Sequence, residues 1–154
     1  MSKLINVQTP FYFYDVALLQ KTLNKINEEA NKYKFHIHYA LKANANPKIL
    51  QLIKNAGLGA DCVSGNEVKA AVENGFDNQK IVFAGVGKSD LEIIYALQKN
   101  IFCFNCESIQ EMEVINELAQ KNNCTAQIAL RINPNVNANT HHYITTGLEE
   151  NKFG

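Results

Sequence analysis

Lys42 directly follows a stretch of sequence that alternates in the way a β-strand does. Within residues 35–42, Phe, Ile, Tyr and Leu alternate with His, His and Ala, and Asn46-Pro47 then interrupts the pattern. Parallel α/β proteins place their chemistry at the carboxyl ends of strands. A lysine amine at such an end can attack a carbonyl carbon and form a Schiff base, which makes Lys42 a candidate nucleophile. The alternative is a solvated loop lysine, and the neighbouring strands must decide between the two.

Other predicted strands also end in polar or ionisable residues, namely Asp61, Asn105 with Glu107, and Arg131. If the strands are parallel, these ends share one rim, where an amine, a carboxylate and a guanidinium could surround one small ligand. A nearby Arg131 would lower the pKa of the Lys42 amine, which matters because only the free amine attacks an aldehyde. Polar residues also end strands in α/β proteins without such a site, so spacing alone leaves both interpretations open.

The elements that must position these residues follow a regular alternation. Apolar spacing predicts a helix over residues 17–33, after a strand-like opening at 10–14. Further strands are predicted at 35–42, 59–63, 80–84, 101–105 and 126–132, and helices at 47–55, 64–74, 90–99 and 108–121. Ser64 and Ser108 each precede a glutamate by three residues, as in a capping box. Five strands separated by single helices predict a parallel sheet, either doubly wound or the first part of an eight-stranded barrel.

Two glycine-containing motifs resemble nucleotide-binding loops but fail on spacing. The run Gly85-Val-Gly-Lys-Ser89 follows a strand, yet a P-loop needs a glycine where this sequence has Val82. Gly57-Leu-Gly59 precedes its strand, whereas a dinucleotide-binding turn must follow one. We therefore do not expect nucleotide binding at either loop.

No metal or redox site is expected from the sequence. Cys103 and Cys106 would fall on opposite faces of a strand and read as buried, reduced thiols. His141 and His142 are adjacent and have no nearby carboxylate or third imidazole.

Composition narrows the class of partner. Fifteen basic and fifteen acidic side chains cancel and are scattered, so there is no electrostatic footprint for nucleic acid or an anionic membrane. The sequence shows neither a signal peptide nor an apolar stretch of membrane-spanning length. We expect a cytoplasmic protein with a small-molecule partner.

Several segments together resemble the diaminopimelate decarboxylases. They are 39–47 (Tyr-Ala-Leu-Lys-Ala-Asn-Ala-Asn-Pro), 57–67 (Gly-Leu-Gly-Ala-Asp-Cys-Val-Ser-Gly-Asn-Glu) and 131–134 (Arg-Ile-Asn-Pro). Thr140-His141, Ile-Thr-Thr-Gly-Leu at 144–148 and Asn-Lys-Phe-Gly at 151–154 continue the likeness. The resemblance thus runs from about residue 9 to the last residue.

The resemblance implies a fold of the alanine-racemase type, which is a pyridoxal-phosphate-binding (β/α)8 barrel with a separate β domain. Residues 1–16 would supply a strand to that β domain, and residues 17–154 would form the N-terminal part of the barrel. We accordingly expect a longer parent protein, a homodimer, and little or no activity in this chain by itself.

The resemblance also assigns roles to individual residues. Lys42 matches the catalytic lysine that binds pyridoxal 5'-phosphate as a Schiff base. Asp61 and Glu67 match carboxylates near that lysine and the cofactor, and Arg131 matches an arginine near the cofactor ring. Ala40, His141 and the neighbouring Tyr39 fall in matching motifs and would contribute packing or contacts with the cofactor.

The implied reaction is decarboxylation of meso-2,6-diaminopimelate to L-lysine and carbon dioxide, the last step of lysine biosynthesis. Ornithine, arginine and carboxynorspermidine decarboxylases share the implied fold and lysine, so they stay as alternatives. Alanine racemases fit less well because their pattern continues differently after Ala45. A non-catalytic relative that binds another protein is the remaining alternative.

Overall fold

The computed structural model of the chain describes residues 7–136. The chain divides into two compact units, residues 1–35 and residues 36–154. Among the described residues, no helix is both long enough and apolar enough to cross a membrane.

In the first unit, the described residues form helix α1 (Val16–Tyr33), which begins within one residue of its predicted start. Its first turn is capped by Asp15, whose carboxylate accepts a hydrogen bond from Leu18 N at 2.9 Å. The helix ends at Lys34, which takes the left-handed conformation with φ 58°. Residues 10–14, predicted as strand-like, form no strand among the described residues. That residues 1–16 join a separate β domain stays a prediction.

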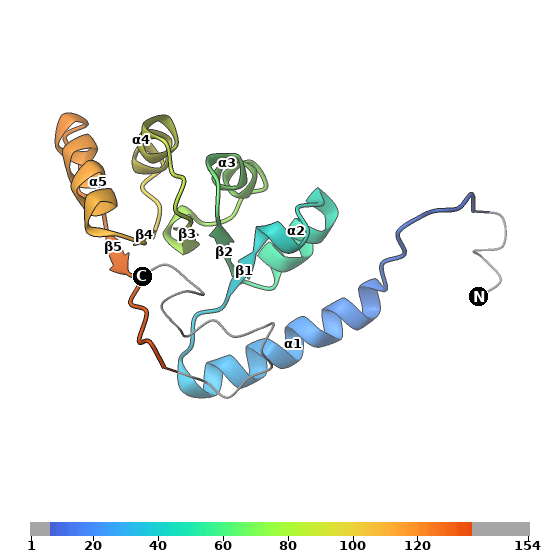
Figure 1. Cartoon of the computed structure of the whole chain (residues 1–154). Helices are drawn as coiled ribbons and strands as arrows, with labels where there is room; N and C mark the ends of the chain where they lie inside the picture. The colour runs from blue at the N-terminus through green and yellow to red at the C-terminus, as the bar shows by residue number, and fades with distance from the viewer. Residues whose placement is uncertain (1–6, 137–154) are drawn as a thin grey trace. The chain divides into compact units, whose positions relative to one another are not determined.

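The second unit is built on a five-stranded parallel sheet in the order β1-β2-β3-β4-β5 (Figure 1). The strands are β1 (His38–Ala40), β2 (Gly59–Cys62), β3 (Ile81–Phe83), β4 (Cys103–Cys106) and β5 (Ile128–Leu130). The connecting helices are α2 (Pro47–Asn55), α3 (Gly65–Glu73), α4 (Asp90–Gln98) and α5 (Ile109–Lys121), with short 3-10 turns η2 (Leu41–Ala43) and η3 (Asn78–Lys80). The predicted alternation of strands and helices is therefore confirmed.

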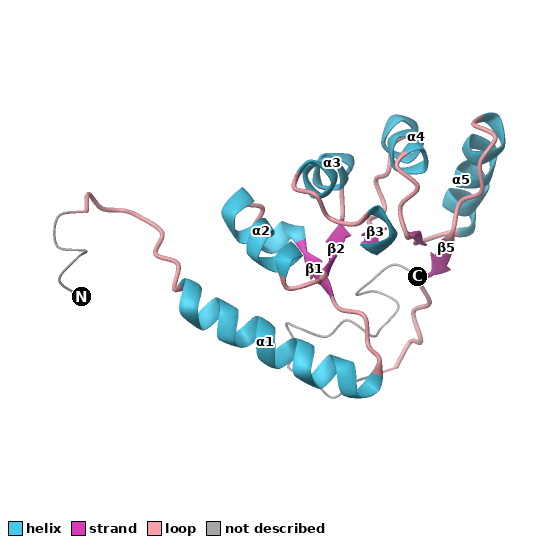
Figure 2. Ribbon diagram, turned by 180° about the vertical axis from the view of Figure 1, so that it is seen from behind, coloured by secondary structure: helices cyan, strands magenta, loops and turns pink. Residues whose placement is uncertain are grey.

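Helices α2 to α5 lie side by side along one face of the sheet, as both ribbon views show (Figure 1, Figure 2). The strand residues that point toward them are fully buried or nearly so, at most 1% exposed: Ala60, Cys62, Ile81, Phe83, Phe104 and Cys106. Burying a side chain such as Phe83 stabilises the fold by about 1.5–3 kcal/mol. The core thus lies between sheet and helices, and the other face of the sheet is left for a site.

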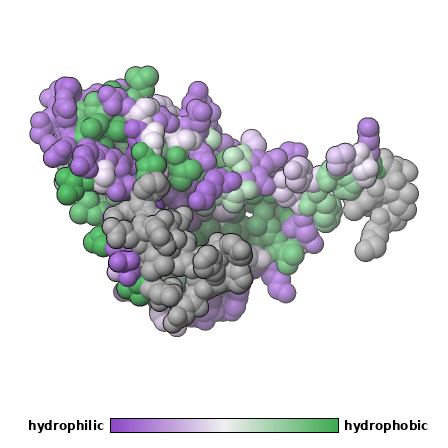
Figure 3. All heavy atoms as spheres, in the orientation of Figure 1, coloured by the Kyte–Doolittle hydropathy of each residue, from purple (hydrophilic) through white to green (hydrophobic). Residues whose placement is uncertain are grey.

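The last strand of the sheet is the least covered. Ile128 is 40% exposed and Leu130 61% exposed, whereas the equivalent side chains of β3 and β4 are buried. In Figure 3, hydrophobic residues show among hydrophilic ones over the part of the surface formed by α5 and β5.

Helices α3, α4 and α5 begin in the same way. Each has a serine N-cap and a glutamate three residues later: Ser64 with Glu67, Ser89 with Glu92, and Ser108 with Glu111. Only the middle pair closes as a reciprocal box, with Ser89 N donating to Glu92 at 2.9 Å. Glu67 and Glu111 instead accept from the residue before the cap, Val63 and Glu107, each at 2.8 Å. These two bonds differ from the predicted capping boxes. They hold the backbone where the chain leaves β2 and β4.

Candidate functional site

The carboxyl ends of all five strands lie at one edge of the sheet because every neighbouring pair is parallel. Ala40 pairs with Asp61, and Asn105 pairs with Ala129. Since side chains alternate along a strand, these four residues point away from the helix-covered face. The sheet thus places Ala40, Asp61, Asn105 and Ala129 on its open face, and Arg131 follows β5 at the same edge.

Lys42 lies one turn beyond the strand rather than at its last position. β1 ends at Ala40, and Lys42 is the middle residue of η2. The prediction of a strand reaching residue 42 was wrong in this detail because Leu41, at 1% exposure, turns inward and anchors the chain. Lys42 itself is exposed. The burial of Leu41 therefore holds the turn while the neighbouring amine stays free to react.

Two hydrogen bonds tie this turn to the helix that follows. The Tyr39 hydroxyl donates to Asn44 O at 3.2 Å, and Asn44 Oδ1 accepts from Asn46 N at 2.9 Å. Asn46 in turn caps α2 by accepting from Lys48 N at 3.0 Å. The Asn-Ala-Asn-Pro sequence after Lys42 is thus a connected set of turns that fixes the position of the lysine backbone.

Asp61 is half-buried, and Lys42 and His38 lie near enough to act on its carboxyl electrostatically. Burial raises the pKa of the Asp61 carboxyl, and the positive charge of Lys42, followed by that of His38, opposes the rise. Lys42 thus acts on the Asp61 carboxyl in the folded chain, and a shared role of the two residues at a cofactor stays a prediction. His38 was not predicted as a site residue, although its place two residues before Ala40 puts it on the same face.

The His38 ring is packed against the open face of the sheet. It stacks on Phe102, with ring centroids 6.2 Å apart. Within the part of the chain that the structure describes, its Nδ1 atom is buried without a hydrogen-bond partner. His38, on the strand next to that of Asp61, thus contributes a ring to the same part of the sheet.

Glu67 has a structural task in this chain. Its carboxylate accepts from Val63 N at 2.8 Å, and its own N–H donates to Ser64 Oγ at 3.3 Å. Both bonds close the start of α3, which follows the strand that carries Asp61. A further contact of Glu67 with a cofactor stays a prediction, as does a contact of Ala40.

Arg131 follows β5 and is held by a carboxylate from the neighbouring strand end. Its Nη1 donates to Glu107 Oε2 at 2.6 Å, and its backbone N–H donates to Cys106 O at 2.9 Å. The Glu107 side chain is only 6% exposed, whereas that of Arg131 is 36% exposed. Beside them lies a hollow of about 330 Å³ lined by Ala84, Asn105, Glu107, Ala129, Leu130 and Arg131.

Lys88, in the loop that resembles a P-loop, does not face solvent. Its side chain is 1% exposed, and Nζ donates to Gly85 O at 2.7 Å, Asn105 O at 3.0 Å and Glu111 Oε1 at 2.5 Å. With all three ammonium protons engaged, this lysine cannot meet a phosphate. The expectation that this loop is not a nucleotide site agrees with these contacts.

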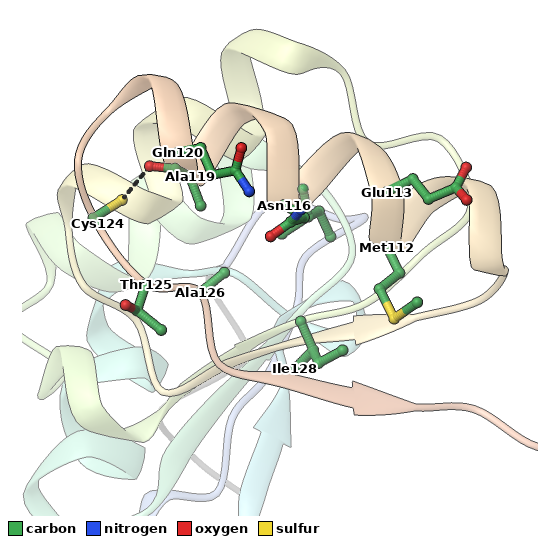
Figure 4. Close-up of a pocket in the computed structure, with 10 residues that line it drawn as sticks. Met112, Glu113, Asn116, Ala119, Gln120, Cys124, Thr125, Ala126 and Ile128 are labelled. Carbon is green, nitrogen blue, oxygen red and sulfur yellow. Dashed lines mark hydrogen bonds between the residues drawn. The ribbon is translucent and has the colours of Figure 1, made fainter.

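A larger hollow of about 520 Å³ lies between α5 and the segment leading into β5 (Figure 4). Its lining is mostly apolar and includes Met112, Ile115, Ala126 and Ile128. Among the described residues that line it, Glu113 is the only one with a carboxylate. It lacks the convergent polar groups of a catalytic site, so size alone does not mark the chemistry here.

The sequence also raised the cysteines and a histidine pair as possible redox or metal sites. Cys62, Cys103 and Cys106 are buried and free, as expected for reduced thiols, while Cys124 is exposed. The described residues hold no group of three His, Cys, Asp or Glu side chains able to bind a metal ion. His141 lies outside the described residues.

Residues 16–154 match the family described as pyridoxal-dependent decarboxylase, pyridoxal binding domain. The chain belongs to this family. The match includes Lys42, Asp61 and Arg131 and thus the whole candidate site. Within this decarboxylase family, the five-stranded sheet is the first part of a (β/α)8 barrel, which decides between the two sheet types left open by the sequence pattern.

Individual relatives agree with the family. The chain is 59% identical over 155 residues to the diaminopimelate decarboxylase of Bacteroides thetaiotaomicron, covering all of this chain and 40% of that enzyme. A crystal structure of the Helicobacter pylori diaminopimelate decarboxylase complexed with L-lysine superposes with a TM-score of 0.87 at 45% identity, over 99% of this chain and 39% of that one. The M. jannaschii enzyme in complex with L-lysine gives 0.78 at 44% identity, over 88% of this chain and 33% of that one. The chain therefore spans about 33–40% of the length of these decarboxylases.

Proposed function

We propose that this chain is the lysine-bearing part of a diaminopimelate decarboxylase, which converts meso-2,6-diaminopimelate to L-lysine and carbon dioxide. The observation that carries the proposal is an exposed lysine, Lys42, which follows the buried Leu41 at the carboxyl edge of the sheet and acts electrostatically on the Asp61 carboxyl. The identity of 59% to a diaminopimelate decarboxylase supports the choice of reaction.

The residues present fit pyridoxal 5'-phosphate. An accessible amine suits its aldehyde, and the guanidinium of Arg131, on the same edge of the sheet, suits an anionic aromatic ligand. We assign Lys42 as the covalent anchor and Asp61 and Arg131 as cofactor contacts, with Glu67, Ala40 and His141 as further contacts. Phosphate-binding groups are not among these assignments.

When bound, the cofactor serves as the electron sink for the carbanion left by the departing carboxylate. The chain's own residues prepare that chemistry. The Lys42 Nζ supplies the nucleophile, and the nearby Asp61 takes up and returns the proton as the amine forms and releases its covalent bond. The η2 turn fixes the lysine backbone, so the amine reaches the same position in each cycle.

The substrate assignment rests on the relatives. Two solved diaminopimelate decarboxylases bind L-lysine, the product of the proposed reaction. An ornithine decarboxylase of Entamoeba histolytica shares the fold at a lower identity of 28% and a TM-score of 0.63. A homodimer and a cytoplasmic location belong to the same proposal. Because the chain spans only part of its relatives, we also propose that it has little or no activity by itself.

The test is an assay of carbon dioxide release from meso-diaminopimelate by the protein that contains this chain, supplied with pyridoxal 5'-phosphate. We expect release with this substrate, together with the visible absorption of a lysine-bound cofactor. Both are expected to be lost in Lys42→Ala and kept in Lys48→Ala, since Lys48 is an exposed lysine at the start of α2.

Three outcomes would contradict parts of the proposal. Release from ornithine or arginine but not from diaminopimelate would refute the substrate. Full activity in Lys42→Ala would refute the anchor. A folded protein that never binds the cofactor would identify a non-catalytic relative.

A further inference from the structure

The loop that resembles a P-loop places a buried cation behind the candidate site. The side chain of Lys88 is 1% exposed, and its ammonium group lies 5.3 Å from the centroid of the Phe83 ring. Its three acceptors come from three places in the fold: Gly85 in the same loop, Asn105 on β4, and Glu111 in the first turn of α5. A lysine is rarely buried so completely unless it is paired, and here the pair is with Glu111.

The contacts continue from Lys88 to Arg131. While one oxygen of Glu111 binds Lys88, the other accepts from Glu107 N at 2.8 Å. The Glu107 carboxylate then accepts from Gly85 N at 3.1 Å and from Arg131 at 2.6 Å. The order of charges is therefore cation, carboxylate, carboxylate, cation. Gly85 closes a ring, because its carbonyl binds Lys88 and its N–H binds Glu107.

Stability alone is a weak reason for such an arrangement. A buried ion pair loses much of its Coulomb attraction to the cost of removing both charges from water. The arrangement does fix a position, however. The Arg131 guanidinium donates to Glu107 at 2.6 Å and its backbone N–H donates to Cys106 O at 2.9 Å, so the strand end that carries Glu107 determines where Arg131 lies.

We propose that Lys88 is a positioning residue for Arg131, acting through Glu111 and Glu107. The proposal rests on the proposed function, in which Arg131 contacts the cofactor. With Lys88 present, its positive charge balances that of the Glu111 carboxylate, which accepts from the Glu107 backbone N–H. The Glu107 carboxylate then binds Arg131. Without Lys88, Glu111 becomes a part-buried carboxylate lacking a cation and competes with Glu107 for the guanidinium. Gly85 supports this arrangement, because its carbonyl binds Lys88 and its N–H binds Glu107.

The matched control for Lys88 is another lysine paired with a glutamate of α5. Lys121 Nζ lies 2.5 Å from Glu117 Oε1, the same distance as in the buried pair, but both side chains are 64% exposed. We compare Lys88→Met with Lys121→Met in the protein that contains the chain. Pyridoxal 5'-phosphate is titrated and followed by its visible absorption.

We expect Lys88→Met to weaken cofactor binding about tenfold and Lys121→Met to leave it unchanged. In an Arg131→Met background, Lys88→Met should weaken binding less than about twofold further, because the residue through which it acts is gone. Lys88→Arg, which keeps the charge, should recover part of the loss. Equal losses in both backgrounds would mean that Lys88 has only a structural role, and would overturn the proposal.

A second measurement needs no cofactor. The ¹⁵N–¹H signal of Arg131 Nη1, which donates to Glu107, should move and lose protection from hydrogen exchange in Lys88→Met but not in Lys121→Met. If Lys88→Met fails to fold by circular dichroism, Glu111→Gln, which keeps the shape of the side chain, gives the same comparison. An unchanged Arg131 signal in Glu111→Gln refutes the positioning role.

The two measurements separate the two proposals. If no variant, including the unmodified protein, binds pyridoxal 5'-phosphate while the Arg131 signal still depends on Lys88, the proposed function fails and the positioning role stands. If the cofactor binds and neither Lys88→Met nor Glu111→Gln changes its affinity or the Arg131 signal, the positioning role fails and the proposed function stands.

Discussion

Gly59 lies where three parts of the sheet approach each other beneath the candidate site. A Cβ atom at this position would lie 2.4 Å from Lys80 O and 2.5 Å from His38 Nδ1. Cβ contacts below 3.0 Å are essentially never observed, so the neighbours would have to move. The His38 ring can rotate, but Lys80 O belongs to the backbone just before β3. Gly59→Ala should therefore push β2 away from that backbone, two residues before Asp61.

The size of the effect follows from two opposing contributions. Forcing an extra methyl group into a packed region costs typically 1–3 kcal/mol, and we expect about 3 kcal/mol because a backbone atom must shift. Replacing glycine by alanine also restricts the unfolded chain, which returns about 0.4–1 kcal/mol. The net loss of stability should be about 2 kcal/mol, or about 4–8 °C in Tm for a chain of this size.

The assay is urea unfolding followed by far-ultraviolet circular dichroism, with Gly87→Ala as the matched control. No atom lies within 4 Å of a Cβ at Gly87, so that substitution should be neutral or stabilise by up to about 1 kcal/mol. Adding His38→Ala to Gly59→Ala removes only one of the two close contacts and should not restore full stability. If Gly59→Ala and Gly87→Ala unfold at the same urea concentration, the account of this close approach is wrong.

Two further predictions concern titratable groups. Burial raises the pKa of Asp61, so its favourable contribution to stability is complete below the unfolded pKa of about 4 and is lost as the pH rises through the higher folded value. Asp61→Asn should therefore gain stability relative to the unmodified chain between pH 3 and pH 7, measured by urea midpoints, and a constant difference would contradict the assigned cause. Burial also raises the pKa of Cys62 to about 12, which leaves about one thiol in ten thousand ionised at pH 8. Iodoacetamide followed by mass spectrometry should find Cys124 alkylated well before Cys62, and comparable rates would show that the core opens.

Much of the fold could be predicted because the local signals agree with one another. The Ser-x-x-Glu starts of α3 and α5, the Asn-Pro before α2 and the apolar spacing of each helix all indicate boundaries that lie within about two residues of those observed. Strand ends were harder to predict. The strand before Lys42 stops at Ala40 because Leu41 is buried, and that burial depends on partners elsewhere in the chain.

The candidate site could be predicted only in part, because some of its contacts also depend on residues far away in the sequence. Lys42, Asp61 and Arg131 stand out because ionisable residues after apolar strands are visible in a single sequence. The ion pairs behind Arg131 are not visible in this way, because Lys88 finds its partners 17 and 23 residues away, on β4 and α5. A Gly-Lys-Ser sequence looks the same whether its lysine faces solvent or the interior, and only tertiary packing distinguishes the two.

The order of the strands along the sheet is also their order along the chain, and this affects how the domain can be assembled. Each described strand after the first pairs with one 21–24 residues earlier, as Gly59 does with His38 and Ile128 with Phe104. The entropy lost in closing each loop is therefore nearly the same at every step, and β2 to β5 each pair with the strand directly before them in the chain. During synthesis from the N-terminus, each new strand and helix can add to a sheet that already exists.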